Sequence, residues 1–159
     1  MAALAIIARI ELVASIAALY TPEVLALATG LTAFPLTDAH VLRGSARSAS
    51  CGSTLQAGVA VDADGVITSI GLAAQACAIG QASAAIMARS AVGRSAEDFA
   101  AAEVAIARWL LEGGNVPDWP GLDAIAPARA FPGRHGAIML GWRAVIAALA
   151  TAGGQNTAV

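Results

Sequence analysis

The sequence has no lysine, few aromatic residues and only two cysteines. Its nine basic residues are arginines scattered along the 159-residue chain, and eleven acidic residues bring the net charge to -2. This balance forms no continuous basic stripe for nucleic-acid phosphates. Two cysteines are also too few for the disulfide framework of a small secreted domain. We therefore expect no nucleic-acid partner and a reducing, cytoplasmic location.

Long uninterrupted apolar segments are also missing. A helix that spans a bilayer needs about 20 mostly apolar residues in a row. The N-terminal apolar run contains Arg9 and Glu11, and the run over residues 24–37 contains Gly30 and Pro35. Glu11 also departs from the pattern of a secretory signal. The sequence therefore predicts no membrane span and no secretory leader.

Alanine and other apolar residues are what the chain has in excess. Hydrophobic residues make up 58% of the sequence and charged residues 13%, which is typical of one folded domain and not of a disordered tail. Alanine packs helices closely but buries little surface per residue. We therefore expect a tightly packed helical layer in place of a large aromatic core.

The hydrophobic periodicity predicts one hairpin among several helices. Residues 56–61 and 66–72 flank the turn sequence Asp62-Ala63-Asp64-Gly65, which favours a hairpin. Residues 42–50 fit a loop or a weak edge strand. Helical spacing predicts helices over residues 2–19, 22–28, 76–90 and 96–112, and a final helix that contains residues 138–149. The predicted fold class is α+β, a small antiparallel sheet of about three strands with helices packed on one face.

Two of these helices carry start signals. Thr21 precedes Pro22, and Ser95 stands three residues before Asp98 in the pattern of a capping box. The helix over 96–112 has an apolar stripe that we expect to be buried, while its charged residues stay in solvent. The stripe consists of Phe99, Ile106, Trp109 and Leu110, and the charged residues are Glu103 and Arg108. We divide the chain into an N-terminal helical extension (1–19), a domain (20–152) and a flexible tail (153–159).

The two cysteines stand at element ends on either side of the hairpin. Cys51 lies in Ser-Cys-Gly-Ser before the first hairpin strand, and Cys77 lies at the head of a helix of small residues. The hairpin would return both thiols to one end of the sheet, within reach of one metal ion. A thiol at a helix N-terminus has its thiolate favoured by free amides and the helix dipole. The alternative for Cys77 is a small hydrophobic residue on an alanine-rich helix.

His135 is the third candidate, in Arg134-His135-Gly136-Ala137 at the head of the final helix. Imidazole is a good ligand for zinc or iron, and the alternative is a histidine that makes only a local hydrogen bond. The close ligand pairs of a zinc finger are absent. Phosphate-loop, dinucleotide and nucleophile-elbow motifs are absent as well.

The order of these motifs resembles the iron–sulfur cluster assembly scaffold family, which includes IscU, SufU and the N-terminal domain of NifU. The similarity covers about Tyr20 to Ala150. It rests on the run Tyr20-Thr21-Pro22-Glu23-Val24-Leu25-Ala26-Leu27-Ala28, on Cys51-Gly52 before a hairpin, on Ala76-Cys77-Ala78-Ile79-Gly80-Gln81-Ala82-Ser83-Ala84, and on Arg134-His135-Gly136-Ala137 leading to Leu140 and Trp142. The motif around Cys77 is the most specific of these.

This resemblance implies a scaffold without turnover of its own, which binds iron or a labile iron–sulfur cluster and passes it to acceptor proteins. A cysteine desulfurase is the other implied partner. Family members use three cysteines and an aspartate or another auxiliary ligand. Here Cys51 and Cys77 match, Ser53 replaces the aspartate, and Ala137 stands where the third cysteine belongs. The implied ligands are Cys51, Cys77 and His135, with Ser53 as a weak neighbour, and a homodimer would supply more.

Two other functions fit the same sequence. A degenerate paralogue would keep the fold and act as an interaction protein without metal. A SufU-like relative would bind zinc and accept persulfide sulfur as an enzyme. Iron with acid-labile sulfide, zinc, or no metal in the purified protein distinguishes the three.

Overall fold

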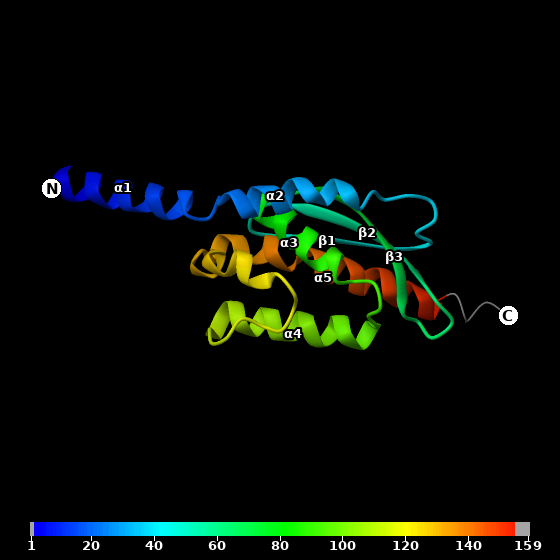
Figure 1. Ribbon diagram of the computed structural model, residues 1–159. Helices are drawn as coiled ribbons and strands as arrows, with labels where there is room; N and C mark the ends of the chain where they lie inside the picture. The colour runs from blue at the N-terminus through cyan, green and yellow to red at the C-terminus, as the bar shows by residue number, and fades with distance from the viewer. Residues whose placement is uncertain (1, 155–159) are drawn as a thin grey trace.

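Three antiparallel strands and their helices make up the computed structural model, which describes residues 2–154 (Figure 1). The helices are α1 (Ala2–Ala17), α2 (Pro22–Gly30), α3 (Ala78–Arg89), α4 (Ala96–Glu112) and α5 (Pro132–Gly154). The strands are β1 (Leu42–Arg47), β2 (Thr54–Val61) and β3 (Ile67–Gln75), and two 3-10 segments cover Leu31–Ala33 and Leu122–Ala130. The α+β class predicted from the sequence is confirmed.

The strands follow one another in the sheet in the order β1-β2-β3. Leu42 of β1 pairs with Val59 of β2, and Thr54 at the start of β2 pairs with Gln75 at the end of β3. The 42–50 segment, expected as a loop or a weak edge strand, forms an edge strand over its first six residues. The last residues of β3 and the first of β2 therefore share one end of the sheet.

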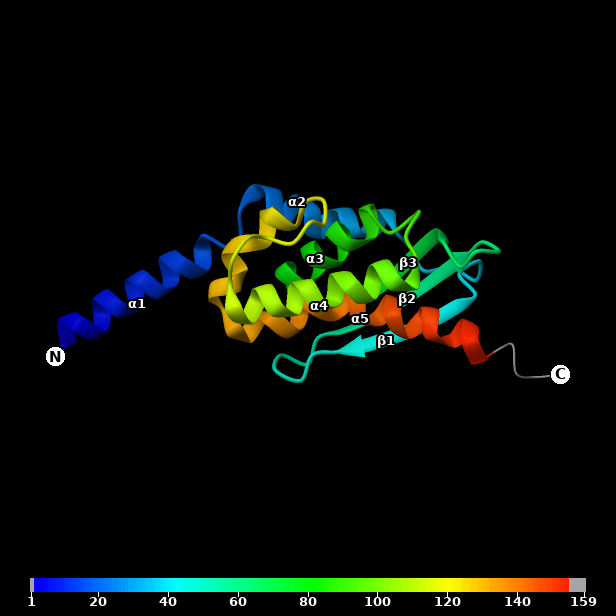
Figure 2. The ribbon, with the colours of Figure 1, turned by 90° about the horizontal axis from the view of Figure 1, so that it is seen from below.

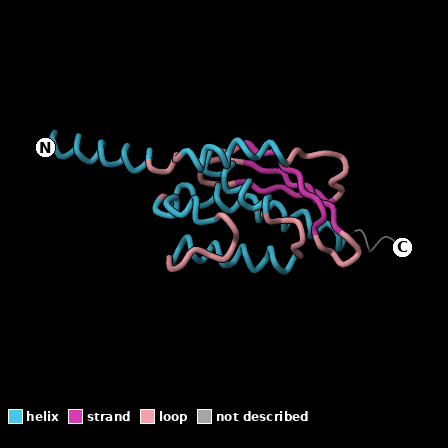
Figure 3. Tube along the Cα trace, in the orientation of Figure 1, coloured by secondary structure: helices cyan, strands magenta, loops and turns pink. Residues whose placement is uncertain are grey.

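Helices cover one face of this sheet, as Figures 2 and 3 show. Helix α5 lies along β1 and β2, α3 packs against α5 and α2, and α4 lies outside on α5. The closest approach is at Gly44 of β1, where an added Cβ would collide with the α5 backbone at Ala144 and Ala148. A side chain at residue 44 would therefore push α5 away from the sheet.

The opposite face of the sheet carries His40, a residue for which the sequence indicated no role. Gly58 and Gly71 pair directly across β2 and β3, and a Cβ on either would collide with the His40 side chain. His40 is 7% exposed, and its ring Nδ1 accepts a hydrogen bond from the Thr37 backbone N–H at 3.1 Å. The two paired glycines thus leave the space in which the His40 side chain packs against the sheet.

The core between α3, α4 and α5 is built around three aromatic rings. The Phe99 and Trp119 ring centroids are 5.3 Å apart, and those of Trp119 and Trp142 are 5.5 Å apart, both in edge-to-face geometry. The predicted α4 stripe is buried throughout; it consists of Phe99, Ile106, Trp109 and Leu110. Arg108 is exposed as expected, whereas Glu103 is half-buried because it forms an ion pair with Arg143 at 3.1 Å.

Both predicted helix caps are present. The Thr21 hydroxyl accepts from the Val24 N–H at 3.1 Å, and Ser95 and Asp98 form a reciprocal capping box. The Asp98 carboxylate accepts hydrogen bonds from the Ser95 N–H and the Ser95 hydroxyl. Both lower the pKa of Asp98, and the bond from the N–H has the larger effect. Local sequence signals therefore fix where α2 and α4 begin.

Helix α5 is long and apolar enough to span a membrane by length and composition. Half of its most apolar 18-residue window is buried inside the domain, where Trp142, Ala144 and Val145 are fully covered. Its apolar character is therefore explained by its position as the central core helix.

Candidate metal or sulfur site

Cys51 lies in a tight turn between β1 and β2. The turn is closed at its base by a hydrogen bond from the Ser48 N–H to the Ser53 carbonyl at 2.8 Å and by one from the Gly52 N–H to the Ser48 carbonyl at 2.9 Å. Gly52 has a φ of 70°, in the left-handed region that favours glycine. The turn therefore holds the Cys51 side chain in an exposed position.

Hydroxyl groups surround the Cys51 sulfur. Its Sγ donates to the Ser53 Oγ at 3.0 Å, and the Ser48 Oγ is 3.1 Å from the Ser50 Oγ. When the thiol loses its proton, the thiolate can accept hydrogen bonds from Ser48 and Ser53; these bonds, with the positive charge of Arg134 nearby, lower the pKa of Cys51 from 9.0 to about 7. The lowered pKa therefore makes thiolate available on an exposed side chain near neutral pH.

Cys77 lies at the other side of the hairpin, as the N-cap residue of α3. Its backbone is extended, with φ -64° and ψ 168°, and its side chain makes no capping hydrogen bond. The thiol is half-buried. Thr54, the first residue of β2, pairs with Gln75, the last residue of β3. Cys51 is three residues before β2 and Cys77 is two residues after β3, so both lie at the same end of the sheet. This is the placement that the hairpin pattern predicted.

The first turn of α5 reaches the same region from a third direction. A Cβ at Gly136 would collide with the Ser48 hydroxyl, and a Cβ at Gly80 of α3 would lie 3.3 Å from the Ala137 Cβ. Ala137 is 1% exposed, on the side of α5 that faces α3. Ala137, which the resemblance aligns with a cysteine, thus lies next to the helix turn that begins at Cys77 and offers only a methyl group there.

The His135 side chain is hydrogen-bonded to the 3-10 segment in this structure and not to either cysteine. Its Nε2 is 2.7 Å from the Arg129 carbonyl oxygen, and it lines a shallow pocket with Leu110 and Leu111 of α4. Across residues 2–154, no group of three or more His, Cys, Asp or Glu side chains has the spacing of a metal site. His135 would have to leave the Arg129 carbonyl to join the cysteines.

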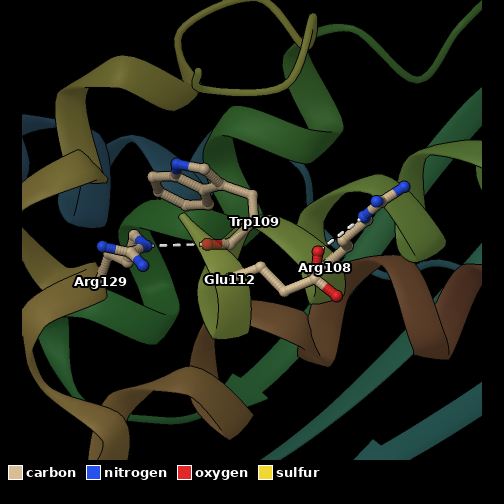
Figure 4. A network of polar contacts seen from close by, with 4 residues as sticks. All are labelled: Arg108, Trp109, Glu112 and Arg129. Carbon is tan, nitrogen blue, oxygen red and sulfur yellow. Dashed lines mark hydrogen bonds and ion pairs between the residues drawn. The ribbon is translucent and has the colours of Figure 1, made fainter. Parts of the chain in front are cut away.

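A separate polar network ties α4 to the 3-10 segment (Figure 4). The Arg129 Nε donates to the Trp109 carbonyl at 2.8 Å, and the Arg108 Nε donates to the Glu112 carboxylate at 2.8 Å. The Arg108–Glu112 pair is exposed on both sides, and such pairs contribute little. The side chain of Arg129 thus contacts α4, while its carbonyl is hydrogen-bonded to His135, and we assign this network no chemistry.

Sequence reasoning did not single out two residues that shape the site. Ser48 is 3% exposed and supports the Cys51 turn, and Gly136 leaves room for the Ser48 hydroxyl. The sequence signal for Ser48 was the serine-rich run before Cys51. Its contact with Gly136 joins residues 88 positions apart in the chain, and only the tertiary structure reveals it.

Comparison with known proteins bears on this site. No protein-family model matches the chain, and no curated protein matches it. Among solved structures, the N-terminal part of a nitrogen-fixing NifU-like protein from Brucella abortus is similar, with 28% identity and a TM-score of 0.79. The match covers 89% of this chain and 99% of that one.

A second similar structure is a candidate iron–sulfur cluster assembly scaffold protein for the SUF system from Fervidobacterium islandicum. It has 18% identity and a TM-score of 0.72, and the match covers 82% of this chain and 96% of that one. At this identity the likeness concerns the fold alone. The resemblance to NifU N-terminal and SufU scaffold proteins is confirmed by these neighbours.

Proposed function

We propose that this protein is a scaffold or carrier that binds iron or a labile iron–sulfur cluster through Cys51 and Cys77 and passes it to acceptor proteins. The observation that supports this proposal is the position of both cysteines at one end of the sheet, in a fold shared with a NifU-like protein. Cys51 is on an exposed turn, and Cys77 stands at the N-cap position of α3. Thiolates are the ligands that iron–sulfur clusters prefer.

The ligand set fits such a cargo only in part. Two thiolates from one chain leave coordination positions open, because Ala137 has no donor atom. The nearest additional donor is the Ser53 hydroxyl, 3.0 Å from the Cys51 sulfur, and His135 is a further candidate. Oxygen and nitrogen are harder donors than sulfur. We therefore propose weak binding, suited to transfer, with the missing ligands supplied by a second copy or by the acceptor.

The implied partners follow from this role. A cysteine desulfurase would deliver sulfur to the Cys51 end, and acceptor proteins would dock there to remove the cluster. We place this activity in a reducing, cytoplasmic compartment, because both thiols must stay free to bind metal. The protein itself would catalyse no net reaction.

The second candidate function is sulfur acceptance at a zinc site, and the state of Cys51 favours it. Its thiol is exposed and its pKa is lowered to about 7, so a nucleophilic thiolate is available near neutral pH. That thiolate would attack the outer sulfur of a donor persulfide. The new S–S bond would form on Cys51 as the donor thiolate leaves.

Metal analysis of protein purified without oxygen tests the proposal. We expect iron and acid-labile sulfide in the wild type, and loss of most of both in Cys51→Ser and in Cys77→Ser. Unfolding curves for each variant show whether the domain is still intact. Zinc in place of iron would support the sulfur acceptor, and a folded protein with neither metal would support a metal-free interaction protein.

A further inference from the structure

Helix α1 has no partner inside the domain. It extends away from the other elements in two perpendicular views (Figures 1 and 2), and none of its residues is buried. Its large apolar residues are 38–72% exposed; they are Leu4, Ile6, Ile7, Ile10, Leu12, Val13 and Ile16. A contiguous apolar surface of this kind is typical of an interaction site.

One face of α1 carries the spacing of a helix-to-helix seam. Small and branched residues recur at intervals of three and four positions, which is the a/d pattern of a coiled coil: Ala3, Ile6, Ile10, Val13 and Ala17. A shallow groove along this face is lined by Ile6, Ile10, Val13 and Ala17, with Arg9 and Ala14 at its edges. We call the five a/d residues, Ala3, Ile6, Ile10, Val13 and Ala17, the α1 seam. Leu4 and Leu12 lie off it.

A lipid surface fits α1 poorly. A helix of 16 residues is about 24 Å long, which is shorter than the roughly 30 Å of a hydrocarbon core. Its single Arg9 and single Glu11 cancel, so it has no basic face for anionic headgroups. Helix α2 cannot extend it as a span, because the two helices are bent by 49° and α2 buries Val24 and Leu27 in the domain.

We propose that the α1 seam pairs with the α1 seam of a second copy of this chain, in antiparallel orientation. The orientation follows from size. Paired helix axes lie about 8–10 Å apart, whereas a domain of this length is about 30 Å across. Only residues 18–21 link α1 to α2. A parallel pair would bring two domains to the same end, and an antiparallel pair separates them.

The residue pattern of the seam is compatible with antiparallel pairing. Small residues stand at both its ends and branched residues in its middle. In the a-to-d register, Ile10 packs against Val13 of the partner subunit and Ile6 against Ala17 of the partner subunit. Ile6, Ile10 and Val13 of the seam are 57–66% exposed, so pairing two such short helices would bury an interface near the lower limit of about 1,000 Å² for a specific one. We therefore expect a reversible dimer with a dissociation constant in the micromolar range.

This pairing does not depend on the proposed metal function, and its test is done on metal-free protein. The full chain is measured by sedimentation equilibrium over a concentration series in the presence of a chelator. Ile10→Glu places a charge in the middle of the seam, and Leu4→Glu places the same charge off it. The two sites are comparably exposed in the monomer, at 63% and 72%, so they form a matched pair.

We expect the wild type and Leu4→Glu to dimerise alike, and Ile10→Glu to raise the dissociation constant at least about tenfold. A wild type that stays monomeric at all concentrations would overturn the proposal, and so would equal loss of association in both variants. Co-sedimentation with vesicles of phosphatidylcholine and phosphatidylglycerol is measured in parallel. Vesicle binding by a wild type that does not dimerise would assign α1 to lipid instead.

Discussion

The aromatic core and the cysteine end of the domain are held together in different ways. In the core, Trp142 is fully buried, and Trp119 stacks between Phe99 and Trp142 while its Nε1 donates to the Ile86 carbonyl at 3.2 Å. At the cysteine end, an exposed Cys51 is held by a turn and by serine hydroxyls. Cys51 takes no part in the core packing and Cys77 only borders it, so we expect the ligand set to change with little loss of the domain.

The largest effect that separates the two regions is expected from Ile106→Ala. Ile106 is fully buried on α4, so truncation leaves a cavity and costs about 2–4 kcal/mol of unfolding free energy. Metal content per folded chain should stay unchanged. Val104→Ala on the same helix is the control, because Val104 is 64% exposed and should change stability by less than about 0.5 kcal/mol. Denaturant unfolding and metal analysis measure both; loss of metal in folded Ile106→Ala would contradict the separation.

Gly136→Ala probes the contact between the core helix α5 and the Cys51 turn. The added methyl would collide with the Ser48 hydroxyl, so we expect a cost of about 1–3 kcal/mol and a changed alkylation rate at Cys51. Gly133→Ala is the matched control on the same helix turn, since its Cβ would meet nothing within 4 Å. Equal stability and equal Cys51 reactivity in the two variants would show that α5 does not position the turn.

Ser48→Ala tests the electrostatics of the cysteine end without touching the core. The Ser48 hydrogen bond is the largest contribution to the lowered pKa of Cys51, so its loss raises that pKa. In the wild type, the alkylation rate should rise with pH, reach half its maximum near pH 7 and level off above. The first unit by which the pKa rises lowers the thiolate fraction at pH 7 roughly fivefold, and each further unit lowers it roughly tenfold. Rates measured on a Cys77→Ser background isolate Cys51, with exposed Ser45→Ala as the control. An unchanged pH profile in Ser48→Ala would contradict this assignment.

His135→Ala should have the smallest effect. Its imidazole must leave the Arg129 carbonyl to reach the cysteines, so we expect a partial loss of iron, smaller than in either cysteine variant. Anaerobic reconstitution with iron and sulfide, followed by iron analysis and visible absorption, measures it. Equal iron content and identical spectra in wild type and variant would remove His135 from the ligand set.

Local patterns predicted most of the fold. The Asp62–Gly65 turn between β-branched runs marked the hairpin, and Thr21 and Ser95 marked two helix starts that the structure confirms. Strand β1 was less clear because its residues are small and polar, and its pairing with β2 and α5 supplies what its own propensity lacks. The packing of His40 against Gly58 and Gly71 was not predictable, because it depends on the pairing of these two glycines across neighbouring strands.

The candidate site was predictable to the extent that it follows from topology. A hairpin between Cys51 and Cys77 was enough to place both at one end of the sheet. The direction of the His135 ring was not predictable, because it depends on the Arg129 carbonyl in the preceding 3-10 segment. The solvent exposure of α1 was equally hidden, since an apolar stripe in a sequence does not say whether its partner is in the same chain.

The central claim is that Cys51 and Cys77 bind the same metal ion. Metal protection against alkylation tests it most directly: anaerobic protein is titrated with iron(II) or zinc, treated with a maleimide and weighed by intact-protein mass spectrometry. We predict that metal protects both thiols together, so that chains carry either no adduct or two at every metal concentration. A metal-saturated protein in which one cysteine is protected while the other reacts at its metal-free rate would contradict the shared site.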